Sequence, residues 1–240
     1  MKYENFEQLK ADCSNCKNCP LGETRTNLVF GVGNENADIL FVGEGPGENE
    51  DLQGEPFVGK AGQLLDKYLN VIDLDRKKNI YIANIVKCRP PQNRDPKPEE
   101  QEVCIEWLRN QTRLIKPKII VCLGRIAAQK LISEDFRVTK QHGEFFQKGN
   151  ILFMGTFHPA ALLRNPNNKP DALSDFQALR EKIKEYAIEF RRYGKAREAA
   201  FTIPFAFESE KIVACSKGVV SYITPVSNEG VSEVNIENYL

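Results

Sequence analysis

The chain has 240 residues, of which 41% are hydrophobic and 28% charged, a balance typical of a globular domain with enough apolar material for a core. Its 33 basic and 33 acidic residues cancel, so any binding of nucleic acid must depend on a local basic patch. No apolar run approaches the roughly 20 residues of a membrane span, and the first residues lack the apolar segment of a signal peptide. We therefore expect a cytoplasmic protein without a membrane partner, whose seven cysteines are not a disulfide framework.

Short apolar runs alternate with segments of helical periodicity along most of the chain. Strands that alternate with helices favour a mostly parallel sheet with helices on both faces, so the sequence predicts an α/β fold. The predicted strands cover residues 39–42, 80–83, 119–123 and 151–154, and the predicted helices cover 1–12, 62–69, 126–132 and a segment that starts at Pro98.

Three cysteines near the start of the chain have the spacing of a metal site. Cys13, Cys16 and Cys19 form two overlapping Cys-x-x-Cys pairs, and such a pair is a common half-site for zinc or an iron–sulfur cluster. A second pair must come from elsewhere, and Cys88 and Cys104 are the best candidates because both lie in polar surroundings. The alternative is that these thiols are structural and inactive in redox chemistry.

Residues 43–47 contain three glycines and one proline and directly follow the first predicted strand. This composition predicts a tight loop at the carboxyl end of the strand, where open α/β sheets place their ligand sites. Glycines there let a flat ligand approach the backbone, and an acidic cluster follows at residues 48–51. The alternative is a surface turn with solvated acids.

Two later strand ends carry polar side chains that suit a pocket at the same edge of the sheet. Asn84 follows the second predicted strand, and its amide offers both a hydrogen-bond donor and an acceptor. His158 follows the fourth predicted strand, and Pro159 fixes the turn behind it. A lone histidine is more often structural, which is our interpretation of His142. The position of His158 favours a functional role.

Basic residues lie on the two loops that follow these strand ends. Prolines stiffen the first loop, which suits contact with a phosphate backbone, although a long exposed connection is the simpler alternative. The second loop also carries apolar side chains, which either anchor the loop or wedge into a base stack. The predicted DNA-binding residues are Lys87, Arg89 and Arg94 in the first loop and Leu162, Leu163 and Arg164 in the second.

The ordered set of segments resembles the iron–sulfur family 4 uracil-DNA glycosylases from about Cys16 to Lys182. No single segment is decisive, but the set at these spacings is highly specific. The matching segments are Cys16-x-x-Cys19-Pro20-Leu21, Val42-Gly43-Glu44-Gly45-Pro46-Gly47-Glu48, Gly54-x-Pro56-Phe57-Val58-Gly59-x-Ala61-Gly62, Asn84-x-x-Lys87-Cys88-Arg89-Pro90-Pro91-x-Asn93-Arg94, Pro117-x-Ile119-Ile120, Leu123-Gly124 and His158-Pro159.

The resemblance implies a three-layer αβα sandwich with a central four-stranded parallel sheet. It also implies a monofunctional DNA glycosylase of base excision repair. Such an enzyme flips uracil out of DNA and hydrolyses its N-glycosidic bond, which gives free uracil and an abasic site. The partner would be uracil-containing DNA, single- or double-stranded, at the nucleoid, and we expect the protein to be a monomer.

The resemblance assigns five residues to the uracil pocket. Phe57 would stack on the flipped base, and Asn84 would read the uracil edge by donor and acceptor together. Glu50 matches the position that crowds out the thymine methyl group. Gly43 and Gly45 would offer backbone N–H groups to the base.

Two residues would act on the bond that breaks. His158 would donate a hydrogen bond to uracil O2 as negative charge develops there. Glu44 would position water or stabilise the oxocarbenium-like sugar, as a carboxylate does in glycoside hydrolysis. No catalytic metal is required.

The resemblance further implies a structural 4Fe–4S cluster that holds the DNA-contacting loops in place. Cys13 would then be a bystander, although its overlapping pair leaves a shift of the ligand frame open. Cys122 lies within an apolar run and is interpreted as a buried strand residue. The ligands would be Cys16, Cys19, Cys88 and Cys104.

Three alternatives compete with this interpretation. A related lineage that traps DNA covalently carries a histidine-containing insertion after the second motif, but residues 89–98 contain no histidine, so turnover is expected. A cluster-bearing DNA-binding module attached to a polymerase needs no quartet of Glu44, Phe57, Asn84 and His158. A zinc-ribbon protein would need four thiolates and no pocket for a flat base.

The end of the chain departs from the family pattern. We expect residues 1–190 to form the glycosylase domain with its cluster and residues 191–240 to form a C-terminal extension of unknown role. Residues 191–197 predict a basic helix, more typical of solvated surface than of a DNA contact, and 201–207 and 219–223 predict strands. Packing on the core, self-association and binding of a partner all remain open for this extension.

Overall fold

The structure is a computed structural model that describes residues 3–186, 212–216, 219–223 and 232–235. The chain divides into two compact units, Met1–Tyr193 and Gly194–Leu240. Within the described ranges, no helix combines the length and the hydrophobicity that crossing a membrane requires.

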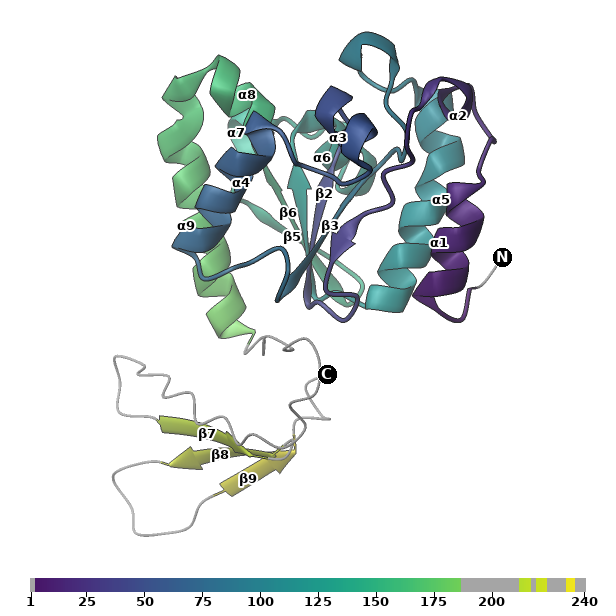
Figure 1. Cartoon of the computed structure of the whole chain (residues 1–240). Coiled ribbons are helices and arrows are strands. Elements are labelled where there is room, and N and C mark those ends of the chain that lie inside the picture. The colour runs from purple at the N-terminus through teal and green to yellow at the C-terminus, as the bar shows by residue number, and fades with distance from the viewer. Residues whose placement is uncertain (1–2, 187–211, 217–218, 224–231, 236–240) are drawn as a thin grey trace. The chain divides into compact units, whose positions relative to one another are not determined.

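A six-stranded mixed sheet forms the centre of the first unit, in the order β1-β3-β2-β4-β6-β5 (Figure 1). Its four inner strands run parallel, which confirms the predicted central sheet. The edge strands β1 and β5 pair antiparallel with their neighbours, so the sheet is wider than predicted. The strands are β1 (Val32–Gly33), β2 (Ile39–Gly43), β3 (Ile80–Asn84), β4 (Ile119–Leu123), β5 (Phe145–Lys148) and β6 (Ile151–Thr156).

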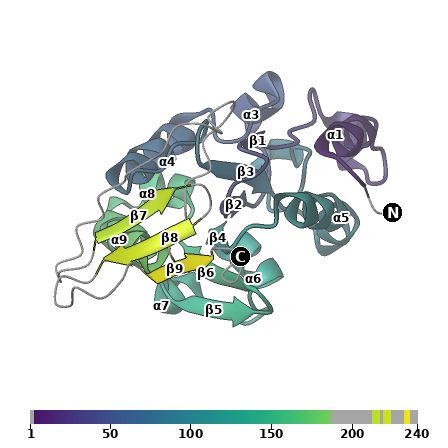
Figure 2. The same cartoon turned by 90° about the horizontal axis from the view of Figure 1, so that it is seen from below.

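Helices cover both faces of this sheet, and two separate hydrophobic cores fill the space between the layers. Leu40 and Val42 of β2 face the core that contains residues of α1 and α5, whereas Ile39 and Phe41 face the core that contains residues of α4 and α9. Figure 2 shows these two pairs of helices on opposite sides of the sheet. The α/β class and the three-layer sandwich are therefore confirmed.

The predicted helices are present, and local signals explain where they begin. The Asn5 side chain accepts a hydrogen bond from Gln8 N at 2.9 Å and caps α1. Pro98 occupies the first turn of α5, where Glu100 accepts from Lys97 N at 2.7 Å. The helices are α1 (Phe6–Ser14), α2 (Leu21–Thr24), α3 (Glu48–Gln53), α4 (Lys60–Val71), α5 (Pro98–Ile115), α6 (Arg125–Leu131), α7 (Val138–Gln141), α8 (Pro159–Arg164) and α9 (Lys169–Glu185), with short 3₁₀ turns at Pro91–Asn93 and Pro166–Asn168.

The described part of the second unit is a three-stranded antiparallel sheet, β7-β8-β9. The strands are β7 (Ile212–Ser216), β8 (Val219–Ile223) and β9 (Ser232–Asn235), and β8 coincides with the predicted strand at 219–223. The helix predicted at 191–197 and the strand predicted at 201–207 lie outside the described residues.

Candidate active site

The carboxyl ends of the inner strands bring the glycine loop and Asn84 together. The parallel register pairs Gly43 at the end of β2 with Asn84 at the end of β3. The two segments stay hydrogen-bonded beyond the strands, because Ile85 N donates to Gly43 O at 2.9 Å and Val86 N donates to Glu44 O at 3.1 Å. The loop after β2 and the loop after β3 therefore leave the sheet side by side.

Asn84 carries a buried acceptor that no neighbouring group uses. The residue is only 2% exposed, and its Oδ1 has no hydrogen-bond partner in the part of the chain that the structure describes. Buried polar side-chain atoms are nearly always paired, so this oxygen beside a glycine loop is open to a hydrogen-bond donor from a ligand or from water. A Cβ on Gly43 would lie 2.4 Å from this Oδ1 and 2.7 Å from Phe57 Cζ, so glycine is required where these two side chains meet.

Replacing Gly43 with alanine is expected to lower ligand affinity at this site by about tenfold or more. The added methyl group must displace Asn84 or Phe57, and overpacking of this kind typically costs about 1–3 kcal/mol. Gly149→Ala is the control for backbone strain without a clash, because a Cβ there meets nothing within 4 Å, its φ is 57°, and the residue lies in the turn between β5 and β6. Titration of a fluorescent oligonucleotide measures both variants, and equal affinities would show that Gly43 does not border the ligand.

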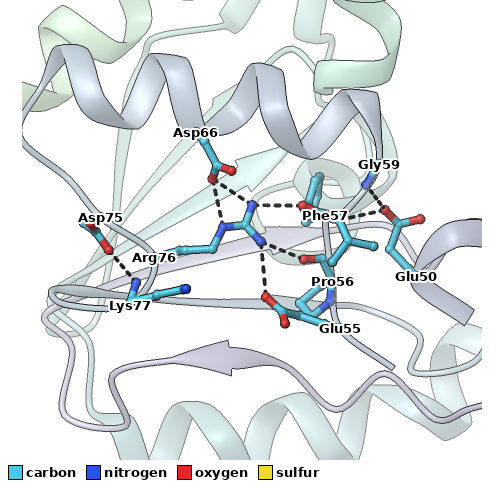
Figure 3. A network of polar contacts seen from close by, with 10 residues as sticks. Glu50, Glu55, Pro56, Phe57, Gly59, Asp66, Asp75, Arg76 and Lys77 are labelled. Carbon is cyan, nitrogen blue, oxygen red and sulfur yellow. Dashed lines mark hydrogen bonds and ion pairs between the residues drawn. The ribbon is translucent and has the colours of Figure 1, made fainter. Parts of the chain in front are cut away.

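Phe57 has a φ of 55°, a left-handed conformation that costs a non-glycine residue about 1–2 kcal/mol. Arg76 holds the strained segment in place (Figure 3). Its Nη1 donates to Pro56 O at 3.1 Å, its Nη2 donates to Phe57 O at 2.9 Å, and its Nε donates to Asp66 Oδ1 at 2.8 Å. Sequence reasoning missed Arg76 and Asp66, since they lie far along the chain from the loop that they fix.

Glu50 closes the other side of the same segment. Its carboxylate accepts hydrogen bonds from Gly47 N at 3.1 Å, Val58 N at 3.0 Å and Gly59 N at 3.2 Å. The side chain thus ties the glycine loop to the residues that follow Phe57, part of which Figure 3 shows. Glu50 shapes the pocket through the backbone, and its contact with a thymine methyl group stays a prediction.

His158 faces Phe57, with the two ring centroids 5.6 Å apart. Ala160 N donates to His158 Nδ1 at 3.1 Å, which assigns the ring proton to Nε2. Burial, together with the positive charge of Arg164, lowers the pKa of His158 to about 4. The half-buried imidazole is therefore neutral at neutral pH and has one free donor, Nε2–H.

Glu44 is a half-buried carboxyl with an unusually high proton affinity. Burial and the neighbouring carboxyl of Asp95 raise its pKa to about 7, against the opposing charges of Arg125 and Arg164. Asp95 itself pairs with Arg125, with an Oδ2–Nη2 distance of 2.6 Å. Sequence reasoning missed Asp95 and Arg125, because only the fold brings the proline-rich loop and the start of α6 to Glu44.

His142 belongs to a different network, which joins β6 to α9. Its Nδ1 lies 2.8 Å from Asp175 Oδ1, and Thr156 Oγ1 donates to Asp175 Oδ2 at 2.5 Å. Thr156 and Asp175 are buried. These contacts stabilise the end of β6, two residues before His158, and agree with the structural interpretation of His142.

Four cysteines from three segments of the chain line one small cavity: Cys16, Cys19, Cys88 and Cys104. Arg25 Nη1 donates to Cys88 Sγ at 3.2 Å, and the backbone N of Lys87 donates to Cys104 Sγ at 3.2 Å. Burial raises the pKa of Cys88 and raises that of Cys104 to about 12, so these thiols need a cationic partner to ionise.

Among the described residues, no group of three or more His, Cys, Asp or Glu side chains could hold a single metal ion. A cluster differs from an ion, because each thiolate binds its own iron. The four cysteines that line the cavity match the number of ligands that such a cluster needs. Cys13 does not line this cavity and is a buried residue of α1.

Comparison with known proteins agrees with this geometry. Residues 30–184 match the family model of the uracil DNA glycosylase superfamily. The chain belongs to the uracil DNA glycosylase superfamily. It is 43% identical over 186 residues to the type-4 uracil-DNA glycosylase of Archaeoglobus fulgidus, a match that covers 74% of this chain and 93% of the relative. The identity is 44% over 170 residues to the type-4 enzyme of Thermotoga maritima, which covers 70% of this chain and 88% of the relative.

A third relative extends the match. The type-4 uracil-DNA glycosylase of Sulfurisphaera tokodaii is 42% identical over 206 residues, which covers 81% of this chain and 93% of the relative. Because these matches span nearly the whole length of each relative, the chain is a member of the type-4 family. The family resemblance seen in the sequence is confirmed.

Two of the predicted DNA-binding residues of this glycosylase-family chain are buried. Lys87 is 0% exposed, and its Nζ donates to Asn84 O at 2.9 Å and to Gln111 Oε1 at 2.7 Å. Leu162 is 1% exposed and packs in the core that contains α4 and α9. Neither side chain reaches the surface, so the prediction that they contact DNA is wrong for this structure.

The other four predicted contacts remain accessible to different degrees. Leu163 is 42% exposed, and Arg164 beside it is also exposed, so both stay candidates for DNA contact. The Arg89 side chain is 24% exposed and donates to Asn93 Oδ1 at 2.8 Å. Arg94 binds both carboxylate oxygens of Glu100, at 2.8 and 2.6 Å, which gives it a structural role at the start of α5.

Proposed function

We propose that this chain is a monofunctional uracil-DNA glycosylase, whose residues 1–190 form the catalytic domain. The observation that carries the proposal is the buried, unpaired Oδ1 of Asn84 beside Phe57 and His158. Uracil presents a donor at N3 and an acceptor at O4, which match the oxygen and nitrogen of one amide. Cytosine presents an acceptor and a donor at these positions, so Asn84 in the same orientation would repel it.

The chemistry follows from the side chains around this pocket. A flipped uracil stacks on Phe57, which replaces the stacking lost from the duplex. When the bond between C1′ and N1 breaks, its electron pair goes to the base and negative charge appears on O2. The Nε2–H of neutral His158 donates to that oxygen, and water adds to C1′ to leave an abasic sugar. Glu44, once ionised, stabilises the positive sugar or orients the water.

A 4Fe–4S cluster bound by Cys16, Cys19, Cys88 and Cys104 is part of this proposal. The fit is supported by the four thiols around one cavity and by the donors that Arg25 and the Lys87 backbone direct at two of the sulfurs. When bound, the cluster would supply a cross-link between the loop that joins α1 to α2, the loop after β3, and α5. Its expected role is structural, because Asn84, Phe57 and His158 do not line the cysteine cavity.

The proposal is tested by incubating the anaerobically purified protein with an end-labelled oligonucleotide that contains one uracil. Alkali-labile cleavage at that position, together with free uracil, is the expected result. A matched oligonucleotide with thymine in place of uracil should remain intact. A protein that binds both oligonucleotides and releases no base from either would overturn the proposal and favour a DNA-binding module.

The rate of uracil release is expected to rise with pH and to level off above about pH 7. Glu44 acts as a carboxylate, and its pKa is raised to about 7, so below that value the active fraction falls about tenfold per pH unit. Asp95→Asn removes one cause of the raised pKa and should move the acid limb to lower pH. Arg125→Gln removes an opposing charge and should move the limb to higher pH. Single-turnover rates between pH 5 and 9 measure both shifts. If the acid limb moved in the same direction in both variants, this electrostatic account would be contradicted.

A further inference from the structure

Lys87 is the one described residue in hydrogen-bond contact with both the uracil-reading residue and a cysteine of the cavity. Its side chain is fully buried, and its Nζ donates to the backbone oxygen of Asn84 at 2.9 Å. Its backbone N donates to Cys104 Sγ at 3.2 Å, and it directly precedes Cys88. Lys87 also lines the cysteine cavity. A single residue therefore connects Asn84 to the cysteine cavity, which Asn84 itself does not line.

The hydrogen bonds of Lys87 place no negative charge beside its Nζ. Both acceptors of its Nζ, Asn84 O and Gln111 Oε1, are neutral amide oxygens. A buried ammonium without nearby negative charge is strongly destabilising. The thiolates of a cluster site carry negative charge, and they lie on the wall of the cavity that Lys87 shares.

The contacts also show how a change at Lys87 would reach the base. The Nζ bond holds the carbonyl of Asn84, the last residue of β3, and Gln111 of α5 holds the Nζ from the other side at 2.7 Å. Gln111 is itself fixed, because its Nε2 donates to Phe30 O at 2.8 Å. Recognition of a base edge by one amide tolerates little displacement, so loss of this anchor should misplace the Asn84 side chain.

We propose that Lys87 is a positioning residue that couples the cysteine-bound cluster to uracil recognition. Its ammonium balances the charge of the thiolates, and its Nζ orients Asn84. The inference rests on the proposed function, since it takes the cluster and the uracil pocket from there. It replaces the DNA contact that the sequence predicts for this lysine.

The first test compares the reduction potential of the cluster in wild type, Lys87→Met and Lys97→Met. Methionine keeps most of the length and apolar volume of lysine and removes the charge. Lys97 is an exposed lysine in the same loop and serves as the control. Removal of a buried positive charge favours the more oxidised cluster, so Lys87→Met should shift the potential to lower values, while Lys97→Met leaves it unchanged. An unchanged potential in Lys87→Met overturns the charge-balancing role.

The second test is a double-mutant cycle on base selectivity, measured as the ratio of dissociation constants for uracil- and thymine-containing oligonucleotides. Lys87→Met alone should lower this selectivity by about tenfold, the value of one charge-assisted hydrogen bond. If Lys87 acts through Asn84, the double variant with Asn84→Ala should be no less selective than Asn84→Ala alone, within about twofold. Additive losses would overturn the coupling.

A third variant keeps the inference testable if Lys87→Met does not fold. Gln111→Leu retains the lysine charge and removes one of its two anchors. It should lower selectivity and leave the potential of the cluster near that of wild type, and unchanged selectivity would contradict the positioning role.

The double-mutant cycle measures dissociation constants and needs no release of the base. A failure of this inference can therefore be distinguished from a failure of the proposed activity. A wild-type protein without iron would overturn the charge-balancing role together with the cofactor assignment, and the cycle would still decide the role toward Asn84.

Discussion

Replacing His158 with alanine is expected to lower the rate of uracil release by about a hundredfold or more. The Nε2–H of this neutral imidazole is the donor aimed at the oxygen on which charge develops, and loss of one such donor typically costs that much in rate. Binding should change far less, since Phe57 and Asn84 still hold the base. The measurement is a single-turnover rate on a labelled oligonucleotide, with affinity measured in parallel.

The control for this prediction is the other histidine. His142→Ala removes a partner of the buried Asp175, so it should lower the melting temperature and reduce the rate by less than about tenfold. His158→Gln separates size from chemistry, because it keeps a neutral donor and should recover part of the lost rate. Equal losses in His158→Ala and His142→Ala would indicate damage to the fold and would remove His158 from the mechanism.

The parts of the fold that the sequence predicts are those with a strong local signal. β2 and β4 are buried at every position, so their sequences are continuous apolar runs bounded by loops. The edge strands lack that signal. β1 has two residues, one of them glycine, and β5 is half-buried to exposed, so neither shows a recognisable period. Their place at the edges comes from pairing with β3 and β6, which no local pattern records.

The residues of the candidate site also fall into those that the sequence could identify and those that it could not. Asn84 and His158 could be identified because they stand at predicted strand ends, and the sheet topology brings such ends to one edge. Arg76 and Asp95 could not, since they reach the pocket through contacts between loops that are distant in sequence. The side chain of Lys87 was predicted to be exposed because a lysine among arginines and prolines indicates a basic surface loop. In the structure its Nζ donates hydrogen bonds to two buried carbonyl oxygens.

Replacing Cys16 with alanine is expected to remove the iron and to lower the melting temperature by about 10 °C. Cys16 lies on the cavity wall with Cys19, Cys88 and Cys104, so its loss leaves one iron without a ligand. Removing a native cross-link of comparable kind costs about 2–5 kcal/mol, which corresponds to such a shift in a domain of this size. Iron content, absorbance of the brown chromophore and thermal unfolding under anaerobic conditions measure the effect.

Cys13→Ala is the matched control, because it decides which of the two overlapping Cys-x-x-Cys pairs binds the cluster. Cys13 is fully buried in α1, away from the cavity lining, so its truncation should retain the iron and cost only about 1 kcal/mol. Loss of iron in Cys13→Ala would shift the ligand frame to the pair Cys13 and Cys16, because Cys16 belongs to both pairs and its removal should lose the iron in either frame. Retention of iron in both variants would show that neither thiol is essential and would return the cavity to a structural role. Neither substitution removes the hydrogen bond that Arg25 Nη1 donates to the backbone Cys16 O at 2.8 Å. The segment should therefore keep its position in both variants, so that a difference in iron content reports the lost thiol.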